Sequence, residues 1–545
     1  MVITDFLEKN ARFYGSDPAI VEINPTEERD NANTWREASL IELAKPDAPY
    51  RREITWRMFN KKANQVAHLL LARNIKKGTK VGILLMNCVE WLPIYFGILK
   101  AGCICVPLNY RYTADEIDYC LTLADVEILI FGYEFIDRIA SIKDKIKNVK
   151  NLFYVGFDKP DFSEDLLKLA NYCSYENPPI KNSEDDIAAI YFSSGTTGFP
   201  KAILHRHKAL TASCMTEQNH HKQTKDDVFL CIPPLYHTGA KMHWFGSLYV
   251  GAKSVILRGI KPEWIFRTIT EEKCTIVWLL VPRALDILES LDDGRLKIDD
   301  YLLDQWWLMH IGAQPVPPSL IKRWLKYFPN HKYDTNYGLS ESLGPGCVHL
   351  GIDNINKVGA IGKPGYQWEA KILDNNGNET KTDVPGELCV KGPGVMLGYY
   401  KNEKATNEVL FDGWLRTGDM AKVDKDGFIF LVDRKKDVII SGGENIYPVQ
   451  IEDYLHNFVK LKDVAVIGLP DKRLGEIVVA VIELKDGENA TDEEVFSFCK
   501  ELPRYKRPKK IIFDKVPRNP TGKIEKPVLR KRYCDVPLVE MQVTS

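Results

Sequence analysis

The sequence predicts an α/β protein with more than one domain. The chain has 545 residues, well beyond the roughly 250–300 at which a single hydrophobic core usually stops growing. Helical patterns alternate with short β-branched runs through about the first four hundred residues, and strands separated by helices favour parallel sheets built from βαβ units. Hydrophobic residues make up 45% and charged residues 27% of the chain. Because this is an ordinary globular composition, disordered and collagen-like classes are excluded.

The alternation is clearest in the first quarter of the chain. We expect helices at residues 56–73, 91–100 and 113–124, and strands at 80–86, 103–107 and 127–131. The last helix begins with Thr113 and has Glu116 three residues later, which is a capping box.

The polar stretch 22–52 mixes charges of both signs. We interpret it as a solvated surface loop.

Charge and cysteine content limit the partners and the compartment. The formal net charge is -1, so no overall field attracts nucleic acid or an anionic membrane. The 12 cysteines are scattered without a CxxC pair, a pattern typical of reduced thiols. The N-terminal residues carry several charges, and the most apolar tract, 81–108, is broken by charges and prolines. We therefore expect a cytoplasmic protein without a signal peptide or a transmembrane segment.

A glycine- and hydroxyl-rich segment ending in Lys201 follows the apolar run 187–192. Backbone N–H groups of glycines and hydroxyl groups bind phosphate oxygens, and a lysine adds a point charge. Lys201 is followed by Ala202, so the segment is not a Walker A loop, which requires GxxxxGK followed by Ser or Thr. Its residues are Ser193, Ser194, Gly195, Thr196, Thr197, Gly198 and Lys201. The composition predicts a phosphate-binding loop.

With its Pro200 and Lys201, this string resembles the phosphate-binding signature of the adenylate-forming superfamily. Seven other strings resemble further motifs of that superfamily, in the same order along residues 54–523. They are the core motif LKAG (99–102) with VPLN (106–109), PPLYHTG (233–239), GAQP (312–315), TNYGLSE (335–341), WLRTGD (414–419), DRKKD (433–437) with SGGEN (441–445), and PRNPTGK (517–523).

The resemblance implies a fold and a division of the chain. It implies a large N-terminal domain of βαβ-built sheets, residues 1–434, that binds ATP and the acid. A smaller, mobile α+β domain, residues 437–545, would carry the catalytic lysine. The hinge would lie near 435–436, at Lys436. The family rotates its small domain between two half-reactions, so both would use one cleft.

The implied reaction is ATP-dependent activation of a carboxylic acid to acyl-AMP, followed by transfer to CoA. Lys523, Glu341, Ser340 and His237 would be the catalytic residues, and Glu341 and Thr196 would bind Mg²⁺. The nucleotide would be bound by the phosphate loop and by Gly312, Ala313, Gln314, Pro315, Thr335, Asn336, Tyr337, Gly338, Leu339, Asp419 and Arg434. CoA would contact Gly442, Gly443 and Glu444.

The acid pocket is implied only in outline. Acetate-activating relatives carry a bulky Trp where this chain has Gly338, so a medium-chain, alicyclic or aromatic acid should fit. The residues expected to line the pocket are His237, Lys241, Trp244, Trp307, His310, Gly338, Leu339 and Gly344. Lys241 could pair with a second carboxylate or extend to solvent, and we favour the second because buried lysines are rare.

Several alternatives share these motifs. An acid:carrier-protein ligase and a luciferase-like oxygenase would both contain them, whereas a catalytically silent nucleotide-binding regulator should have lost Lys523 or Glu341, and both are present. We expect a carboxylic acid, ATP, Mg²⁺ and CoA as partners and no nucleic acid; a homodimer stays open.

The pairs His205/His207 and His220/His221 lack a carboxylate or cysteine at ligand spacing. We interpret them as surface residues.

Overall fold

The computed structural model describes residues 1–25, 51–156, 158–193, 200–312, 316–343, 346–442, 444–518 and 524–534. The chain divides into two compact units. The larger unit comprises Met1–Val316, Leu320–Ala370 and Cys389–Arg416, and the smaller comprises Pro317–Ser319, Lys371–Leu388 and Thr417–Ser545. The boundary expected at 434–437 stays a prediction.

A seven-stranded sheet of the larger unit has the order β14-β13-β12-β10-β11-β1-β2. Neighbouring strands are parallel except for β1 and β2, which are antiparallel. The strands are β1 (Pro18–Ile23), β2 (Arg51–Thr55), β10 (Val228–Cys231), β11 (Lys253–Leu257), β12 (Ile276–Leu280), β13 (Leu308–Gly312) and β14 (Lys332–Asp334).

A second sheet of the larger unit has eight strands in the order β20-β9-β8-β4-β3-β5-β6-β7. It is parallel from β8 to β7, and β9 and β20 are added antiparallel. The strands are β3 (Lys80–Leu84), β4 (Ile104–Pro107), β5 (Val126–Gly132), β6 (Asn151–Val155), β7 (Glu164–Asp165), β8 (Ile187–Phe192), β9 (Ala202–Arg206) and β20 (Gly398–Tyr399). The predicted parallel sheets are thus confirmed.

Helices follow most strands, as the alternation predicted. The helices before the last quarter of the chain are α1 (Ile3–Phe13), α2 (Trp56–Leu71), α3 (Trp91–Lys100), α4 (Ala114–Leu123), α5 (Ile136–Ile142), α6 (Leu166–Asn171), α7 (His207–His221), α8 (Thr238–Val250), α9 (Pro262–Glu272), α10 (Val281–Asp292), α11 (Pro318–Tyr327) and α12 (Glu403–Val409). The capping box of α4 is present, since Glu116 N donates to Thr113 Oγ1 and Thr113 N donates to the Glu116 carboxylate.

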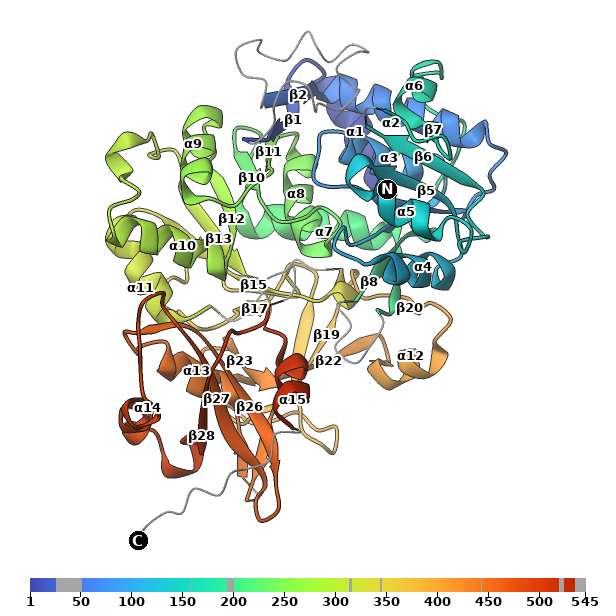
Figure 1. Cartoon of the computed structure of the whole chain (residues 1–545). Helices are drawn as coiled ribbons and strands as arrows, with labels where there is room; N and C mark the ends of the chain where they lie inside the picture. Colours follow the sequence, from blue (N-terminus) through green and yellow to red (C-terminus); the bar gives the residue numbers. More distant parts are fainter. Residues whose placement is uncertain are drawn as a thin grey trace. The chain divides into compact units, whose positions relative to one another are not determined.

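Helices α7 and α8 pack against each other between the two large sheets. α8 contacts β10 and β11 of the seven-stranded sheet, whereas α7 contacts β8 and β9 of the eight-stranded sheet (Figure 1). Their surroundings include a core of large aromatic side chains, in which Trp244 of α8 lies against Phe59 and Phe96. Burial of rings of this size provides much of the hydrophobic stabilisation of a domain. The two helices are therefore well fixed for presenting polar side chains.

The interpretation of 22–52 as a solvated loop is wrong at both ends. Glu22 lies in β1 and is fully buried, and Arg52 of β2 is also buried, with its Nη1 3.8 Å from the Glu22 carboxylate. Arg258 approaches the same carboxylate. Charged residues of opposite sign can be buried when they pair, which the mixed charges of the stretch did not reveal. Residues 26–50 lie outside the described residues.

Two smaller sheets complete the middle of the chain. One is antiparallel and consists of β15 (Asn336–Tyr337), β16 (Val348–His349) and β17 (Lys363–Pro364). The other has five strands, namely β18 (Glu369–Leu373), β19 (Gly386–Lys391), β21 (Leu410–Phe411), β22 (Trp414–Val423) and β23 (Ile429–Arg434).

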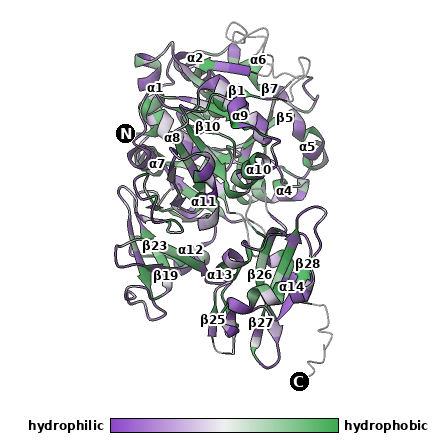
Figure 2. Cartoon of the chain, turned by 90° about the vertical axis from the view of Figure 1, so that its left-hand side faces the viewer, coloured by the Kyte–Doolittle hydropathy of each residue, from purple (hydrophilic) through white to green (hydrophobic). Residues whose placement is uncertain are grey.

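The smaller unit contains a sheet in the order β25-β24-β27-β26, with β28 parallel to β27. The strands are β24 (Ile439–Ser441), β25 (Glu444–Ile446), β26 (Leu461–Asp471), β27 (Gly475–Leu484) and β28 (Lys510–Phe513), and the helices are α13 (Pro448–Leu455), α14 (Asp492–Phe498) and α15 (Lys526–Cys534). The long hairpin β26–β27 is largely hydrophobic (Figure 2). This α+β character matches the expected fold of the C-terminal region.

Candidate active site

The predicted phosphate loop is the connection between β8 and β9. Its two ends are held together, because Ser193 N donates to the Lys201 carbonyl and Lys201 N donates to Ser193 Oγ, both at 3.0 Å. Residues 194–199, which include Ser194, Gly195, Thr196, Thr197 and Gly198, lie outside the described residues. A closed antiparallel hairpin is a suitable base for a loop that presents backbone N–H groups.

Ser340 and Glu341 occupy a short 3₁₀ turn, Ser340–Ser342, after β15. The Tyr399 hydroxyl donates to Glu341 Oε1 at 3.0 Å, and Met396 N donates to the Glu341 carbonyl at 2.8 Å. The Ser340 carbonyl lies 2.8 Å from His205 Nε2, so that nitrogen must carry the proton. Ser340 and Glu341 are themselves half-buried. Contacts from β9 and β20 therefore orient a turn whose side chains retain some exposure.

The side chains of Lys201 and Glu341 both contact Tyr399. Its ring lies under the Lys201 ammonium, 4.6 Å from ring centroid to Nζ, while its hydroxyl binds Glu341. Burial, and then the Glu341 carboxylate, raise the pKa of Tyr399 well above its usual value, so this phenol remains a hydrogen-bond donor. A cation above the ring and an anion at the hydroxyl stabilise one arrangement of all three. Tyr399 was missed by sequence reasoning, because nothing local marks a tyrosine near residue 400.

His237 has a structural role that its motif did not reveal. It is the N-cap of α8, and its Nδ1 accepts a hydrogen bond from Gly239 N at 3.2 Å. The next residue, Thr238, lies 3.5 Å from Ser340 through their hydroxyl oxygens. The beginning of α8 is thereby brought to the Ser340–Glu341 turn, as the predicted site requires.

The segments expected to bind the nucleotide base are adjacent. Gly312 ends β13, and a methyl group on its Cα would lie 3.6 Å from Asn336 Oδ1. Thr335 and Tyr337 flank Asn336, and the Thr335 carbonyl accepts from Leu350 N. Gly338 and Leu339 follow directly and are half-buried. Ala313, Gln314 and Pro315 lie outside the described residues.

The smaller unit places the expected ribose residues on neighbouring strands. Asp419 of β22 is opposite Arg434 of β23, and Arg434 Nε lies 3.4 Å from Asp419 Oδ1. Lys436 lies in the exposed turn after β23, where Asp437 N donates to the Arg434 carbonyl. Gly442 has a φ of +58° in the turn between β24 and β25, a conformation that favours glycine. Glu444 is exposed, and Gly443 lies outside the described residues.

Lys523 belongs to the segment 519–523, which also lies outside the described residues. The residues that flank this segment, Arg518 and Ile524, pair in an antiparallel bridge. Arg518 in turn forms an ion pair with Asp463 of β26, 2.6 Å from Nε to Oδ2. Both ends of the segment are thus attached to the sheet of the smaller unit.

The prediction that Lys241 extends to solvent is wrong. Its side chain is fully buried in α8, Nζ lies 4.3 Å from the Tyr191 ring centroid and donates to the Leu235 carbonyl at 3.4 Å. Burial lowers the pKa of Lys241 to about 7, which makes burial of the amine possible near neutral pH. The rings of Trp91 and Tyr95 also face the amine.

The other residues expected to line the acid pocket are dispersed. Trp244 packs in the aromatic core. Trp307 precedes β13 and donates from Nε1 to Asp227 Oδ1 at 3.0 Å, so it lies at the opposite end of that strand from Gly312. His310 is buried within β13. Gly344 lies outside the described residues.

The interpretation of the paired histidines as surface residues is wrong for three of them. His205, His207 and His221 are each at most 1% exposed, and burial lowers the pKa values of His205 and His207 to about 4. Two carboxylates complete a cluster around His221, namely Glu217, four residues earlier on α7, and the distant Asp334, as two trios of possible ligands show: Glu217, His243 and His310, and His221, His310 and Asp334. The expectation overlooked Glu217, and the fold adds His243, His310 and Asp334 from distant segments that linear spacing does not detect.

The described residues contain no helix that is both long and apolar enough to cross a bilayer.

Two family models match the chain: the AMP-binding enzyme over residues 29–400, and the AMP-binding enzyme C-terminal domain over residues 450–523.

Proteins of known activity are similar over most of the chain. A long-chain-fatty-acid–CoA ligase of Mycobacterium tuberculosis is 30% identical over 88% of this chain and 93% of its own. The 4-hydroxybutyrate–CoA ligase 2 of Metallosphaera sedula is 31% identical over 85% and 87%. The crystal structure of ATP-bound MatB from Rhodopseudomonas palustris superposes with a TM-score of 0.83, at 27% identity over 98% of this chain and 99% of that one. The chain belongs to the AMP-binding enzyme family, which confirms the resemblance to adenylate-forming ligases.

Proposed function

We propose that this protein is an AMP-forming acid–thiol ligase for a medium-chain, alicyclic or aromatic acid. It activates the acid with ATP to acyl-AMP and pyrophosphate, and then transfers the acyl group to CoA with release of AMP. The observation that carries the proposal is the turn Ser340–Glu341, oriented by Tyr399 beside Lys201 at the end of the phosphate-loop hairpin. Family membership supports the reaction class.

Glu341 fits the role of a Mg²⁺ ligand. Mg²⁺ prefers oxygen ligands and is usually bound through one or two carboxylates, and Glu341 is a half-buried carboxylate whose Oε1 is oriented by one hydroxyl. Thr196 would contribute a second oxygen. A bound Mg²⁺ offsets the negative charge of the phosphate oxygens that the acid carboxylate must approach.

The chain's own groups would position the nucleotide and favour the transition state. Ser340 would donate to the α-phosphate, and the glycines and hydroxyls of the phosphate loop would bind the β- and γ-phosphates with Lys201. The segments ending at Gly312 and Tyr337 would enclose the base, and Asp419 would accept from the ribose hydroxyls beside Arg434. Lys523 would stabilise charge that develops between carboxylate and α-phosphate. Fixed donors of this kind act more strongly on the transition state than on either ground state.

The second half-reaction would depend on rotation of a C-terminal domain, residues 437–545, about Lys436. The exposed side chain of Lys436 supports this role, because its backbone angles can change without moving a side chain out of a packed core. The tight turn at Gly442 supports close approach of the CoA thiol arm to the backbone of Gly442, Gly443 and Glu444.

The acid would bind where α8 begins, near His237, Gly338 and Leu339. This placement is supported by the contact between Thr238 and Ser340. The relatives named above act on acids of very different length, so family membership alone does not select among candidate acids.

We also propose a cytoplasmic location. All twelve cysteines, which are all among the described residues, are free thiols, and eleven of them are shielded from solvent at least in part. Free thiols are typical of proteins that work in a reducing compartment.

An ATP–pyrophosphate exchange screen tests the proposal. Acetate, hexanoate, cyclohexanecarboxylate, benzoate and palmitate should be compared with purified full-length protein and Mg²⁺. We expect exchange with hexanoate, cyclohexanecarboxylate or benzoate well above exchange with acetate. Exchange with none of the five acids would contradict the proposal.

The thiol acceptor is tested in a second assay with the preferred acid. CoA should be acylated in the absence of oxygen. Acylation of a phosphopantetheine carrier protein instead of CoA would identify a carrier-protein ligase, and an oxygen-dependent product would identify an oxygenase.

A further inference from the structure

Three buried side chains converge on a small volume in the larger unit. His221 is the last residue of α7, His310 lies in β13, and Asp334 ends β14. His221 Nε2 lies 2.9 Å from His310 Nδ1 and 3.0 Å from Asp334 Oδ2, and the last two atoms are 3.8 Å apart. All three side chains are at most 1% exposed.

The hydrogen bonds around the trio direct two neighbours at one nitrogen of His221, while His349 Nδ1 lies 3.5 Å from Asp334 Oδ2. His221 Nδ1 lies 3.1 Å from Glu217 Oε1, so it donates its proton there. The remaining nitrogen of His221 faces both His310 Nδ1 and Asp334 Oδ2. A carboxylate oxygen is an acceptor only, and one N–H of His221 could satisfy only one of these two neighbours well; the contact of Asp334 Oδ2 with His349 is at the long limit of a hydrogen bond. A central cation would interact favourably with all three atoms.

We propose that His221 Nε2, His310 Nδ1 and Asp334 Oδ2 bind a divalent transition metal ion, with Zn²⁺ the best match. Zn²⁺ bonds to nitrogen and oxygen are about 2.0–2.2 Å, so tetrahedral ligand atoms lie about 3.4 Å from one another. The three distances in the trio, 2.9, 3.0 and 3.8 Å, scatter about that value. Two histidines and one carboxylate also form a well-known ligand set for Zn²⁺. Water takes the fourth position in zinc sites with three protein ligands, so this fully buried ion would need a buried water molecule beside it.

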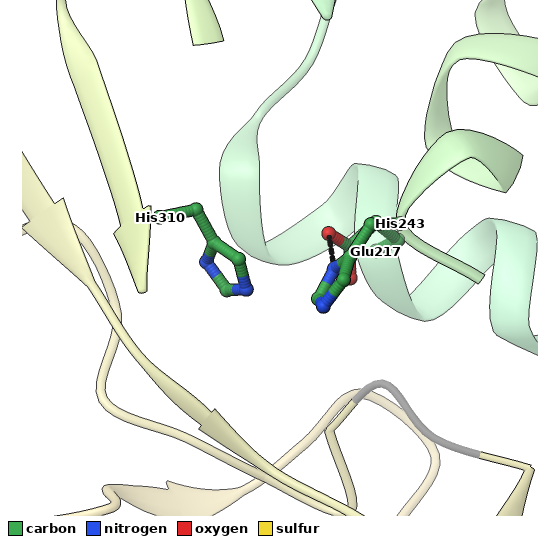
Figure 3. Close-up of side chains that lie close together, drawn as sticks. All are labelled: Glu217, His243 and His310. Carbon is green, nitrogen blue, oxygen red and sulfur yellow. Dashed lines mark hydrogen bonds and ion pairs between the residues drawn. The ribbon is translucent and has the colours of Figure 1, made fainter. Parts of the chain in front are cut away.

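The surrounding contacts have the form expected of an outer shell. Metal-bound histidines usually donate their other N–H to a carboxylate, which fixes the tautomer, and Glu217 accepts from His221 in this way. Glu217 Oε1 also lies 2.6 Å from His243 Nδ1 of α8. Figure 3 shows this contact with His310 facing the pair. Asp334 Oδ1 accepts from Gly351 N at 2.8 Å, which turns Oδ2 toward the two histidines.

Glu217, His243 and His310 form a second possible trio. We favour the first, because its three ligand atoms lie within 3.8 Å of one another and Glu217 Oε1 already accepts from two histidines, whereas Glu217 Oε2 and His310 Nε2 have no hydrogen-bond partner among the described residues.

The ion would join three elements that lead into the proposed nucleotide site. β13 continues to Gly312, and β14 continues to Asn336. A metal ion that connects α7, β13 and β14 would fix the ends of these strands. We therefore assign it a structural role, separate from the Mg²⁺ expected at Glu341.

Metal analysis of the untagged full-length protein tests this site. The protein should be produced with added Zn²⁺, dialysed against metal-free buffer and analysed for bound metals. We expect about one Zn²⁺ per chain, since structural sites hold their metal tightly. After removal of Zn²⁺ by a chelator, added Co²⁺ should restore stoichiometric binding with visible absorption of a tetrahedral site, and should raise the midpoint of thermal unfolding.

Two variants and one matched control locate the ion. His310→Gln and Asp334→Asn should each lower the bound metal at least tenfold. His207→Gln changes a buried histidine at the other end of α7 and should leave it unchanged. Unchanged metal content in both ligand variants would overturn the assignment. If these variants do not fold, the unmodified protein decides: absence of bound Zn²⁺ together with no effect of Co²⁺ on absorption or unfolding would show a purely hydrogen-bonded cluster.

Discussion

The Ser340–Glu341 turn and the histidine–carboxylate cluster around His221 are both polar and both lie in the larger unit, yet they differ in access. Glu341 is half-buried and is oriented mainly by the Tyr399 hydroxyl. Asp334 and Glu217 are fully buried and bonded to several histidines. A carboxylate that serves substrates must remain reachable, whereas a buried one must be neutralised by its neighbours. Changes at the first should therefore affect rate, and changes at the second should affect stability.

Asp334→Asn should have the largest effect on stability. Removing one charge from a buried, hydrogen-bonded group leaves its partners uncompensated and costs about 3–5 kcal/mol. We expect a clear fall in the thermal unfolding midpoint. Asp353→Asn is the control, because Asp353 pairs with Lys222 and Lys332 at the surface, where such pairs contribute about 0–1 kcal/mol. Equal falls in the unfolding midpoint for the two variants would contradict the expectation that the buried carboxylate stabilises the fold more than the surface ion pair does.

Glu341→Gln should give the largest loss of rate. The amide keeps the shape but loses the charge that would bind Mg²⁺, and loss of one such electrostatic contact typically lowers a rate by about 10²–10³. Pyrophosphate exchange measures this step. The unfolding midpoint should stay nearly constant, and a large fall in the midpoint with unchanged exchange would show that Glu341 serves the fold instead.

Lys241→Met should raise stability near neutral pH. Burial lowers the pKa of Lys241 from 10.5 to about 7, so between these values the unfolded chain binds more protons than the folded one. The contribution of Lys241 to stability therefore increases as pH rises from about 7 toward 10.5. Methionine removes this dependence, and we expect a gain on the order of 1–3 kcal/mol at pH 7. The ring faces around the amine offset part of the cost of burying it.

Thermal unfolding of both proteins from pH 6 to pH 9 measures this effect. The difference between them should shrink as pH rises. A constant difference would mean that the buried amine does not titrate in this range.

Tyr399→Phe should have the smallest effect. It removes the hydroxyl that orients Glu341 but keeps the ring beneath Lys201. A hydrogen bond to a charged group contributes about 1.5–3 kcal/mol and a neutral one less, so exchange should fall roughly tenfold. Tyr400→Phe is a control of the same chemistry, since its hydroxyl binds Asp125. A loss in Tyr399→Phe as large as in Glu341→Gln would assign a direct role to the phenol.

The two polar sites also differ in how far the sequence could predict them. The parallel sheets followed from local alternation, and Glu341 was found because seven consecutive residues carry its motif. Tyr399 and His205 reach this turn from β20 and β9 of the eight-stranded sheet, and no local pattern records such contacts. In the cluster, Glu217 and His221 are four residues apart on α7 and share one helix face. That spacing was the only sequence signal for the cluster. His310 and Asp334 are brought to it because β13 and β14 are neighbours in the sheet, which the sequence does not show locally.

The central claim is that Lys523 serves adenylate formation and not thioester formation. Measuring the two half-reactions of Lys523→Ala separately tests this claim most directly. Adenylate formation should be followed by pyrophosphate exchange, and thioester formation should be followed separately with synthetic acyl-adenylate and CoA. The control is Lys515→Ala, which changes an exposed lysine in the same region. We predict that Lys523→Ala loses adenylate formation by about 10²–10³ and retains thioester formation. Equal loss of both half-reactions, or of neither, would contradict the account.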